Sequence, residues 1–310
     1  MTAIPLTFQS GDRSLVGTLT IPTSDAPVPA AVLVSGSGPI DRDSNTKRAR
    51  LGVMRQMAEH LADHGIASLR YDKRGVGASE GDYKAAGFHD NVGDARAAVS
   101  ALRERPEVDR ASVFVVGHSE GALIATELAT ELALDPPLAG VVLLAGAAQP
   151  GKAVLRWQAE QLAGSLPTPV KLVMKLLRQD LSRTQEKRFS QLEATTTDVA
   201  RIQMVKVNAK WFREFMAHDP AESLRRAVVP VLAITGNKDV QVDPGDLDRM
   251  EDLVPTAFDG HVLDDVTHLL RSDDGPASTK TYRKQMKRPV DSELLHLVAS
   301  WINSPDRQVA

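Results

Sequence analysis

The first 150 residues alternate between short runs rich in β-branched residues and longer segments whose apolar residues recur at helical spacing. Five short runs follow this pattern: LVGTLTI (15–21), AAVLVS (30–35), IASLRY (66–71), SVFVVG (112–117) and GVVLLAG (140–146). The segments 48–65 and 122–134 lie between later runs and place apolar residues three or four positions apart. Strands that are apolar throughout are typical of a sheet covered on both faces, and their alternation with helices predicts parallel pairing. We therefore expect an α/β fold with a mostly parallel, doubly wound sheet.

The two ends of this pattern differ from its middle. The runs 15–21 and 30–35 have no helix between them, so we expect them to pair as an antiparallel hairpin. The apolar run VPVLAITG (229–236) predicts another strand, and a short strand is expected around 261–266. A closing helix is predicted over 292–302, with Asp291 as its N-cap.

The segment 151–226 has a different composition. It is rich in Leu, Gln, Lys and Arg and contains no strand-like run. Three stretches of it have amphipathic spacing and are predicted to be helices: 157–166, 170–181 and 207–219. We therefore predict a core domain formed by residues 1–150 and 227–310, which a helical lid at 151–226 interrupts.

Charge and cysteine content limit the partners that this chain can have. It carries 37 Lys and Arg against 40 Asp and Glu, a net charge of −3, and it has no cysteine. This balance predicts no nucleic-acid partner, and the lack of cysteine excludes disulfides and a Cys nucleophile. No basic region with a following apolar stretch opens the sequence, and no apolar run approaches the ~20 residues of a membrane-spanning helix. We expect a soluble cytoplasmic protein, monomeric or homodimeric, that binds a small molecule and no membrane.

Two stretches, GASEG (77–81) and GHSEG (117–121), match the pattern G-x-S-x-G. A nucleophilic serine in this pattern sits on a sharp turn between a strand and a helix, so the residues two before and two after it must be small. The run 112–117 leads directly into GHSEG, and a helical segment begins immediately after Gly121. GASEG is neither directly preceded by a strand-like run nor directly followed by a helical segment. We therefore predict that Ser119 is the nucleophile.

The other serine, Ser79, lies in YDKRGVGASEG (71–81), several residues beyond the preceding strand. We interpret this stretch as a structural turn in which the glycines permit positive φ and Asp72 pairs with Arg74. It is not a dinucleotide-binding loop, because the third glycine and the downstream acidic residue of that motif are missing.

A serine hydroxyl needs a base that removes its proton, and the eight histidines supply the candidates. Three of them lie in helical patterns and are expected to be surface or packing residues: His60, His64 and His296. His118 adjoins the nucleophile, but its side chain should point away, and His261 would lie at the wrong end of a strand. His268 follows the last short strand in a loop that can reach over the carboxyl edge of the sheet, so we predict it as the base.

The acid that orients the base should follow the carboxyl end of the preceding strand. In VPVLAITGNKD the strand ends just before Gly236, which turns the chain, and Asp239 follows. Asp243 is the alternative. The predicted triad is therefore Ser119, Asp239 and His268, in that order along the chain.

Two backbone N–H groups must stabilise the oxyanion that forms when the serine attacks a carbonyl group. One is expected from Glu120, because it follows the nucleophile at the start of a helix. The other is expected from SGSGPIDRD (35–43), whose glycines let the backbone approach a substrate closely, with Ser37 as the donor.

With these stretches the chain resembles the α/β-hydrolase superfamily over nearly its whole length. The similar stretches are SGSGPIDRD, YDKRGVGASEG, GHSEG, GNKD and VTHLL, and 151–226 corresponds to the superfamily's variable helical lid. The first stretch looks like a loop of bacterial esterases related to dienelactone hydrolases and prolyl-oligopeptidase-like proteins, although Ser35 stands where His is usual. The resemblance implies hydrolysis of carboxylic esters without a cofactor and without a metal ion.

The resemblance and the predicted triad favour a serine carboxylesterase that forms an acyl-enzyme from small to medium hydrophobic esters. A peptidase or amidase, and a carbon–carbon bond hydrolase or perhydrolase, could use the same triad, and a non-catalytic binding protein could keep the same fold. The insertion supplies apolar side chains that could line the pocket: Trp157, Leu172, Met174, Leu177, Trp211, Phe212, Phe215 and Met216.

Overall fold

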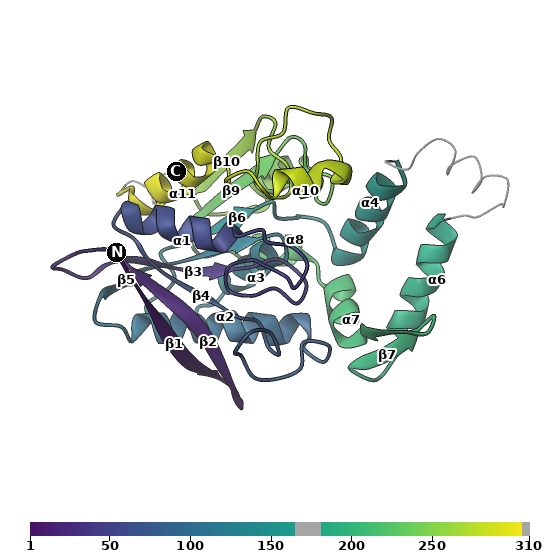
Figure 1. Ribbon diagram of the computed structural model, residues 1–310, viewed down its shortest axis with the longest axis horizontal. Coiled ribbons are helices and arrows are strands. Elements are labelled where there is room, and N and C mark those ends of the chain that lie inside the picture. Colours follow the sequence, from purple (N-terminus) through teal and green to yellow (C-terminus); the bar gives the residue numbers. More distant parts are fainter. Residues whose placement is uncertain (165–180, 306–310) are drawn as a thin grey trace.

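The computed structural model describes residues 1–164 and 181–305, and it is built around an eight-stranded sheet with the order β1-β2-β4-β3-β5-β6-β9-β10 (Figure 1). Its strands are β1 (Thr2–Ser10), β2 (Arg13–Ile21), β3 (Val28–Val34), β4 (Ala67–Tyr71), β5 (Val108–His118), β6 (Gly140–Leu144), β9 (Val231–Gly236) and β10 (Phe258–Leu263). The strands from β4 to β10 in this order pair in parallel, whereas β2 is antiparallel to both of its neighbours. The mostly parallel sheet predicted from the sequence is confirmed.

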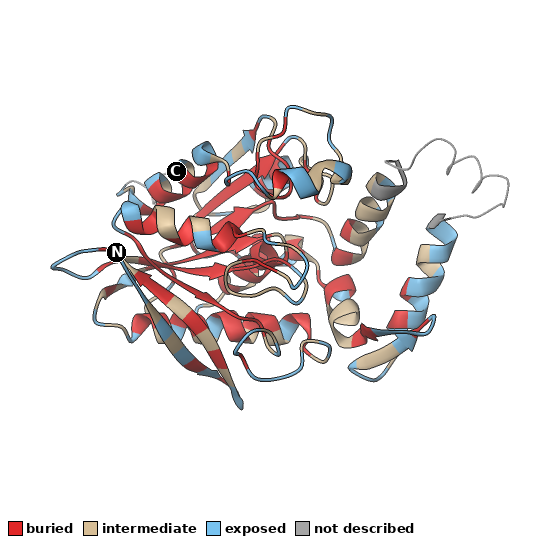
Figure 2. Cartoon of the chain, viewed as in Figure 1, coloured by how far each residue is buried: buried red, intermediate tan, exposed pale blue. Residues whose placement is uncertain are grey.

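Helices cover both faces of the sheet, and the apolar core is therefore split into two layers (Figure 2). One face packs against α1 (Val53–Asp63) and α11 (Ser292–Asn303), and the other against α2 (Phe88–Arg103) and α3 (Glu120–Leu128). In β3 the side chains of Ala30, Val32 and Val34 join one layer, and those of Ala31 and Leu33 join the other. Burial on both faces is the reason that the central strands are apolar throughout.

Shorter helices complete the core domain: α8 (Pro220–Leu224), α9 (Asp246–Leu253), a 3-10 turn (Thr279–Thr281) and α10 (Tyr282–Gln285). Asp291 caps α11, because its carboxylate accepts hydrogen bonds from the backbone N–H groups of Glu293 and Leu294. In the part of the chain that the structure describes, no helix combines the length and the apolar character needed to cross a membrane.

The antiparallel hairpin expected between 15–21 and 30–35 is wrong. The strand β2 pairs instead with β1 on one side and with β4 on the other, so that β4 separates it from β3. The partner β1 lies at the edge of the sheet and most of its residues are exposed or half-buried. An edge strand of this kind needs no continuous apolar run, and the sequence therefore does not signal it.

The described part of the segment 151–217 lies to one side of the core domain (Figure 1). It contains α4 (Gly151–Gly164), α6 (Leu181–Glu193) and α7 (Ala209–Ala217), with a small apolar cluster of its own. The predicted helices 157–166 and 207–219 correspond to parts of α4 and α7, whereas nearly all of 170–181 lies outside the described residues.

The expectation that this segment contains no strand is also wrong. The strands β7 (Val199–Ile202) and β8 (Val205–Asn208) form an antiparallel hairpin. Gln203 and Met204 form its tip with φ values of 49° and 69°. Two consecutive residues with positive φ are typical of a tight hairpin turn, which usually contains glycine or asparagine. Because neither residue is of that type, the sequence carries no turn signal here.

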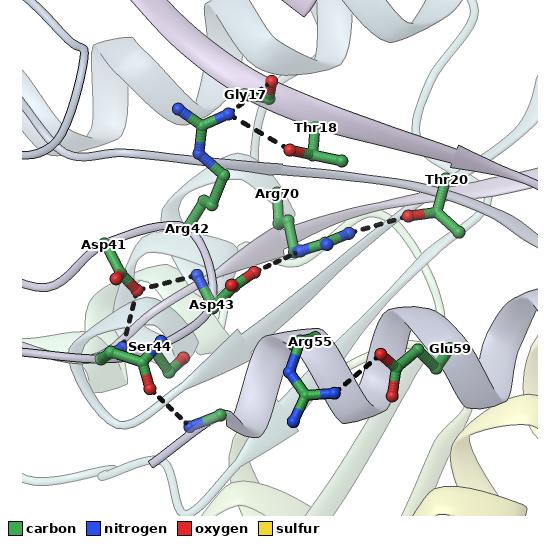
Figure 3. A network of polar contacts seen from close by, with 12 residues as sticks. Gly17, Thr18, Thr20, Asp41, Arg42, Asp43, Ser44, Arg55, Glu59 and Arg70 are labelled. Atoms are coloured by element: carbon green, nitrogen blue, oxygen red, sulfur yellow. Dashed lines mark hydrogen bonds and ion pairs between the residues drawn. The ribbon is translucent and has the colours of Figure 1, made fainter. Parts of the chain in front are cut away.

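Polar contacts, most of them partly buried, hold the loop that follows β3 (Figure 3). Arg42 of this loop donates to the carbonyl oxygen of Gly17 (2.8 Å) and to the hydroxyl group of Thr18 (3.2 Å) on β2. Arg70 on β4 donates to Asp43 of the loop (2.8 Å) and to Thr20 (2.7 Å). The stretch DRD therefore fastens the loop to two neighbouring strands.

Ser35, the first residue of this loop, takes part in the same anchoring. Its buried hydroxyl lies 3.0 Å from the hydroxyl of Ser44, at the other end of the loop. This hydrogen bond closes the loop on itself.

The predicted pairing of Asp72 with Arg74 is wrong. Asp72 forms an ion pair with Arg42 (2.6 Å), and Arg74 turns instead to Asp90 (3.2 Å) and Asp94 (2.8 Å) on α2. Burial alone would raise the pKa of Asp72, but the hydrogen bonds from Arg42 and from two backbone N–H groups outweigh it and lower that pKa. Asp72 therefore remains charged and ties the turn after β4 to the loop after β3.

Replacing Arg42 by Met should lower the free energy of unfolding by about 3 kcal/mol, because Asp72 would remain buried without the cation that balances it. Urea denaturation at neutral pH measures this change. The matched control is Arg55→Met, since Arg55 and Glu59 form an ion pair on the surface of α1 with side chains 48% and 42% exposed. The control should change stability by at most about 0.5 kcal/mol. Equal effects of the two substitutions would refute this role of Arg42.

Candidate active site

Ser119 occupies the turn between β5 and α3, with φ 57° and ψ −117°. Glycines at both ends of the motif make this turn possible. A Cβ atom at Gly117 would lie 2.0 Å from the carbonyl oxygen of Gly121, and one at Gly121 would lie 2.1 Å from the carbonyl oxygen of Val34. Any side chain at either position would therefore force the backbone apart. The turn holds Ser119 in a strained conformation at the carboxyl edge of the sheet.

Ser79, the serine of the second G-x-S-x-G match, is part of the fold. Its buried hydroxyl donates to the carbonyl oxygen of Asp72 (2.7 Å) and accepts from the backbone N–H of Val16 (2.9 Å). These two bonds tie the turn after β4 to β2. The Ser79 hydroxyl therefore serves as a hydrogen-bonding group of the fold, as expected for the structural turn predicted at residues 71–81.

The three side chains predicted as a triad form one hydrogen-bonded chain. His268 Nε2 lies 3.1 Å from the Ser119 hydroxyl, and His268 Nδ1 lies 2.8 Å from a carboxylate oxygen of Asp239. The other oxygen of Asp239 accepts from the backbone N–H groups of Gln241 and Val242. The side chains of His268 and Asp239 are 5% and 0% exposed. This geometry allows His268 to accept the serine proton while Asp239 holds the ring in place.

The structure does not bring the alternative residues into this chain. Asp243 pairs with Arg249 on α9, and its other carboxylate oxygen accepts from the backbone of Gly245. His261 lies on β10, where it pairs with Asp259 (2.9 Å).

His118 has a role that the sequence did not indicate. Its Nε2 lies 2.9 Å from the backbone carbonyl oxygen of His268. Burial, followed by the neighbouring His268, lowers the pKa of His118 to about 3. The ring is therefore neutral at ordinary pH, and its N–H donates to the backbone of the predicted base.

Arg271 supports the same loop from the other side. It is fully buried, and its guanidinium donates to three backbone carbonyl groups, those of Leu269 (2.5 Å), Arg288 (3.0 Å) and Leu51. Burial lowers its pKa to about 10. These bonds connect the His268 loop with the segment before α1 and the segment before α11, so they fix where the imidazole enters the site.

The predicted oxyanion donors lie beside Ser119. A Cβ atom on Gly36 would be 3.2 Å from the Cβ of Ser119, so the backbone of the loop after β3 runs directly against the nucleophile. Glu120 is the first residue of α3, where backbone N–H groups have no partner within the helix. Ser37 and Glu120 both line the same cavity as Ser119. Both residues therefore lie where their predicted role as oxyanion donors requires them, and the role itself stays a prediction.

The side chain of Glu120 forms a buried polar cluster under the cavity. One carboxylate oxygen pairs with Lys73 (2.8 Å), and the other accepts from Asn91 (3.0 Å) and from the indole N–H of Trp211 (2.7 Å). Trp211 lies on α7, so this cluster connects the inserted segment to the residue that follows the nucleophile. The sequence gives no sign of this contact because its members lie far apart along the chain, with Lys73 and Trp211 separated by 138 positions.

The cavity has a volume of about 370 Å³, and α4 and α7 form much of its wall. Of the apolar side chains proposed from the sequence, Trp211, Phe212 and Phe215 line it, with the rings of Trp211 and Phe215 stacked 4.6 Å apart. Met216 packs instead within the inserted segment. Trp157 is half-buried on α4 but is not among the residues that line the cavity. The lining residues of α4 are Val154, Leu155 and Gln158. Three further proposals, Leu172, Met174 and Leu177, lie outside the described residues.

The buried neutral state of His118 predicts a pH dependence. Its pKa is about 3 in the folded protein and 6.5 in its ordinary state. Between these values the unfolded chain binds a proton that the native state does not bind. This residue therefore makes stability fall as the pH falls, by up to about 1.4 kcal/mol per pH unit.

The variant His118→Gln can still donate to the His268 carbonyl, but its side chain does not titrate. We expect its free energy of unfolding to fall less steeply than that of the wild type between about pH 6.5 and about pH 4. Urea unfolding at a series of pH values measures both curves. Curves that run parallel through this interval would contradict a buried, neutral His118.

Comparisons with known proteins identify the family. The family model described as serine aminopeptidase, S33, matches residues 49–274. Esterase EstD of Thermotoga maritima is 29% identical over 312 residues, covering 96% of this chain and 68% of that protein. The structure of Est1E from Butyrivibrio proteoclasticus with bound ferulic acid has a TM-score of 0.62 at 16% identity and covers 96% of both chains. DcsB in complex with its substrate analogue has a TM-score of 0.65 at 15% identity and covers 100% of both chains. The chain therefore has the α/β-hydrolase fold and belongs to the serine aminopeptidase S33 family.

Proposed function

We propose that this protein is a serine carboxylesterase that hydrolyses small to medium hydrophobic esters. The observation that carries the proposal is the hydrogen-bonded chain Ser119–His268–Asp239, which ends at an apolar cavity. The similarity to an enzyme named as an esterase over 96% of this chain supports the same reaction. A volume of about 370 Å³ is near the lower end for small-molecule sites, which suits an ester of modest size.

The reaction follows from the positions of these groups. His268 Nε2 takes the proton of the Ser119 hydroxyl as the oxygen attacks the ester carbonyl, and Asp239 stabilises the imidazolium that forms. The N–H groups of Ser37 and Glu120 stabilise the oxyanion. The C–O bond then breaks, and the proton on His268 goes to the leaving alcohol. A water molecule, deprotonated by the same ring, attacks the acyl-enzyme and releases the acid and the serine.

The charges at the cavity favour an ester over the free amino terminus of a peptide. An aminopeptidase needs an acidic group that binds the substrate ammonium group. Among the described residues that line the cavity, Glu120 is the one acidic side chain, and Lys73, Asn91 and Trp211 already occupy its oxygens. Lys84 and Lys206 also line the cavity and would repel a cation. An aminopeptidase is therefore the weaker candidate.

The assignment of the nucleophile is tested with a fluorophosphonate probe and p-nitrophenyl butyrate. We expect labelling and turnover to be lost in Ser119→Ala, with kcat reduced by at least about 10⁴-fold, because the variant lacks the hydroxyl that lies 3.1 Å from His268 Nε2. Ser79→Ala should retain both activities, although the loss of its buried hydrogen bonds should lower stability by about 1–2 kcal/mol. Labelling of Ser119→Ala at the wild-type rate would refute the proposal.

The preference for uncharged substrates is tested with methyl propionate and alanine methyl ester, which share an acyl skeleton and differ in one ammonium group. We expect kcat/KM to be at least about tenfold lower for the alanine ester, because the lysines repel its charge. In Lys206→Glu the difference in kcat/KM between the two esters should be smaller, because one of the repelling lysines is replaced by an acidic residue. A pH-stat assay measures both rates. A wild-type preference for the alanine ester would instead favour the aminopeptidase.

A further inference from the structure

Three histidines converge between α1 and α11. His60 lies in the last turn of α1, His64 is the C-cap of the same helix, and His296 lies on α11. One ring nitrogen from each lies within 4.8 Å of the other two. The ring centroids of His60 and His64 are 4.2 Å apart, and those of His64 and His296 are 6.2 Å apart.

The hydrogen bonds of these rings leave ring nitrogens that can act as ligands. His64 Nδ1 lies 2.8 Å from the backbone carbonyl oxygen of His60, which can only accept, so Nδ1 carries the proton and Nε2 has a free lone pair. His60 Nε2 is buried and has no hydrogen-bond partner in the structure. His296 Nε2 lies 3.3 Å from the hydroxyl of Ser300, which can donate to it or turn away.

An unpartnered buried ring nitrogen is unusual, because buried polar atoms are nearly always hydrogen-bonded. The ion pairs that histidines form in residues 1–164 and 181–305 involve His218, His261 and His268, and none of these belongs to the cluster. Packing alone therefore does not account for three imidazoles whose ring nitrogens lie this close together, one of them buried and unpartnered.

We propose that His60, His64 and His296 form a binding site for a divalent transition metal ion of the zinc, nickel or copper type. Imidazole nitrogen suits these ions, whereas magnesium and calcium prefer oxygen ligands. Nitrogen ligands 2.0–2.1 Å from a tetrahedral zinc ion lie about 3.4 Å apart, so the rings must approach one another slightly on binding. His64 and His296 are exposed, whereas His60 Nε2 is buried, so we expect the two exposed rings to move toward His60. The hydrogen bond from His64 Nδ1 to a carbonyl group is also the usual way in which a metal-binding imidazole is oriented.

The site lies at the opposite edge of the sheet from Ser119. The carboxyl end of α1 leads into the first residue of β4, at the amino edge of the parallel strands, whereas Ser119 follows the carboxyl end of β5. The helices α1 and α11 pack together there (Figure 1), and Asn303 at the end of α11 donates to the carbonyl oxygen of His64 (3.0 Å). A bound ion would cross-link the two helices, so its expected effect is on stability and not on ester hydrolysis.

The test uses the full chain without a histidine tag, stripped of metal with EDTA and then dialysed. Isothermal titration calorimetry with zinc chloride should show one ion bound per chain, and zinc should raise the Tm by about 3–6 °C when its concentration is about 100 times the Kd. In His60→Ala and in His296→Ala we expect the affinity to fall at least tenfold and the rise in Tm at the same zinc concentration to shrink to about half or less.

The matched control is His89→Ala, which removes an exposed histidine on α2, outside the cluster, and should bind zinc as the wild type does. His296 is exposed, so its variant should have the wild-type Tm in EDTA, which separates lost binding from lost folding. The variant Ser119→Ala should also bind zinc normally, so a failure of the esterase proposal would not affect this result. Absence of zinc binding by the wild type, or equal binding by His296→Ala, would overturn the proposal.

Discussion

A close backbone contact under the nucleophile is the constraint on which the rest of the site depends. Gly117 and Gly121 pack against each other, and Gly121 packs against the backbone of Val34, at distances that leave no room for a Cβ atom. This contact joins the carboxyl ends of β3 and β5 to the start of α3. It forces positive φ on Ser119 and brings the backbone of the loop after β3 against it. The nucleophile and the start of α3, which carries the predicted donor Glu120, therefore take their positions from this packing contact.

Buried polar side chains hold the loops that surround this contact. Loops at the carboxyl edge have left the hydrogen-bond ladder of the sheet, so their backbone groups need other partners. Arg42 and Asp72 connect two of these loops, and Arg271 donates to three carbonyl groups around His268. His118 adds a bond to the backbone carbonyl oxygen of His268 itself. Charged groups inside the fold thus act mainly as hydrogen-bond donors and acceptors that fix loop geometry.

The sequence predictions are correct for features that a short stretch of residues causes, and wrong for features that depend on residues far apart in the chain. The central strands are predictable because burial on both faces requires apolar residues throughout. The turn at Ser119 is predictable because its two glycines lie within one stretch of five residues. The predicted hairpin between the first two apolar runs is wrong because the second partner of β2 is β1. Most residues of β1 are exposed or half-buried, so it has no continuous apolar run that would mark it as a strand. The pairing of Asp72 with Arg74 was wrong because Arg42, 30 residues upstream, is the nearer cation in space. No local pattern reveals a partner at that separation.

By itself, the sequence determined the α/β class of the fold, the serine at the strand–helix turn, and the order of the three residues that can form a triad. These features follow from the periodicity of apolar residues and from the conformations open to glycine, which are properties of short stretches. Only the tertiary structure decided which cation meets Asp72, that His118 supports the His268 loop, that Trp211 reaches Glu120, and that His60, His64 and His296 converge. Each of these contacts joins segments that the sheet topology brings together, and their energies depend on burial and distance, which a one-dimensional pattern does not contain.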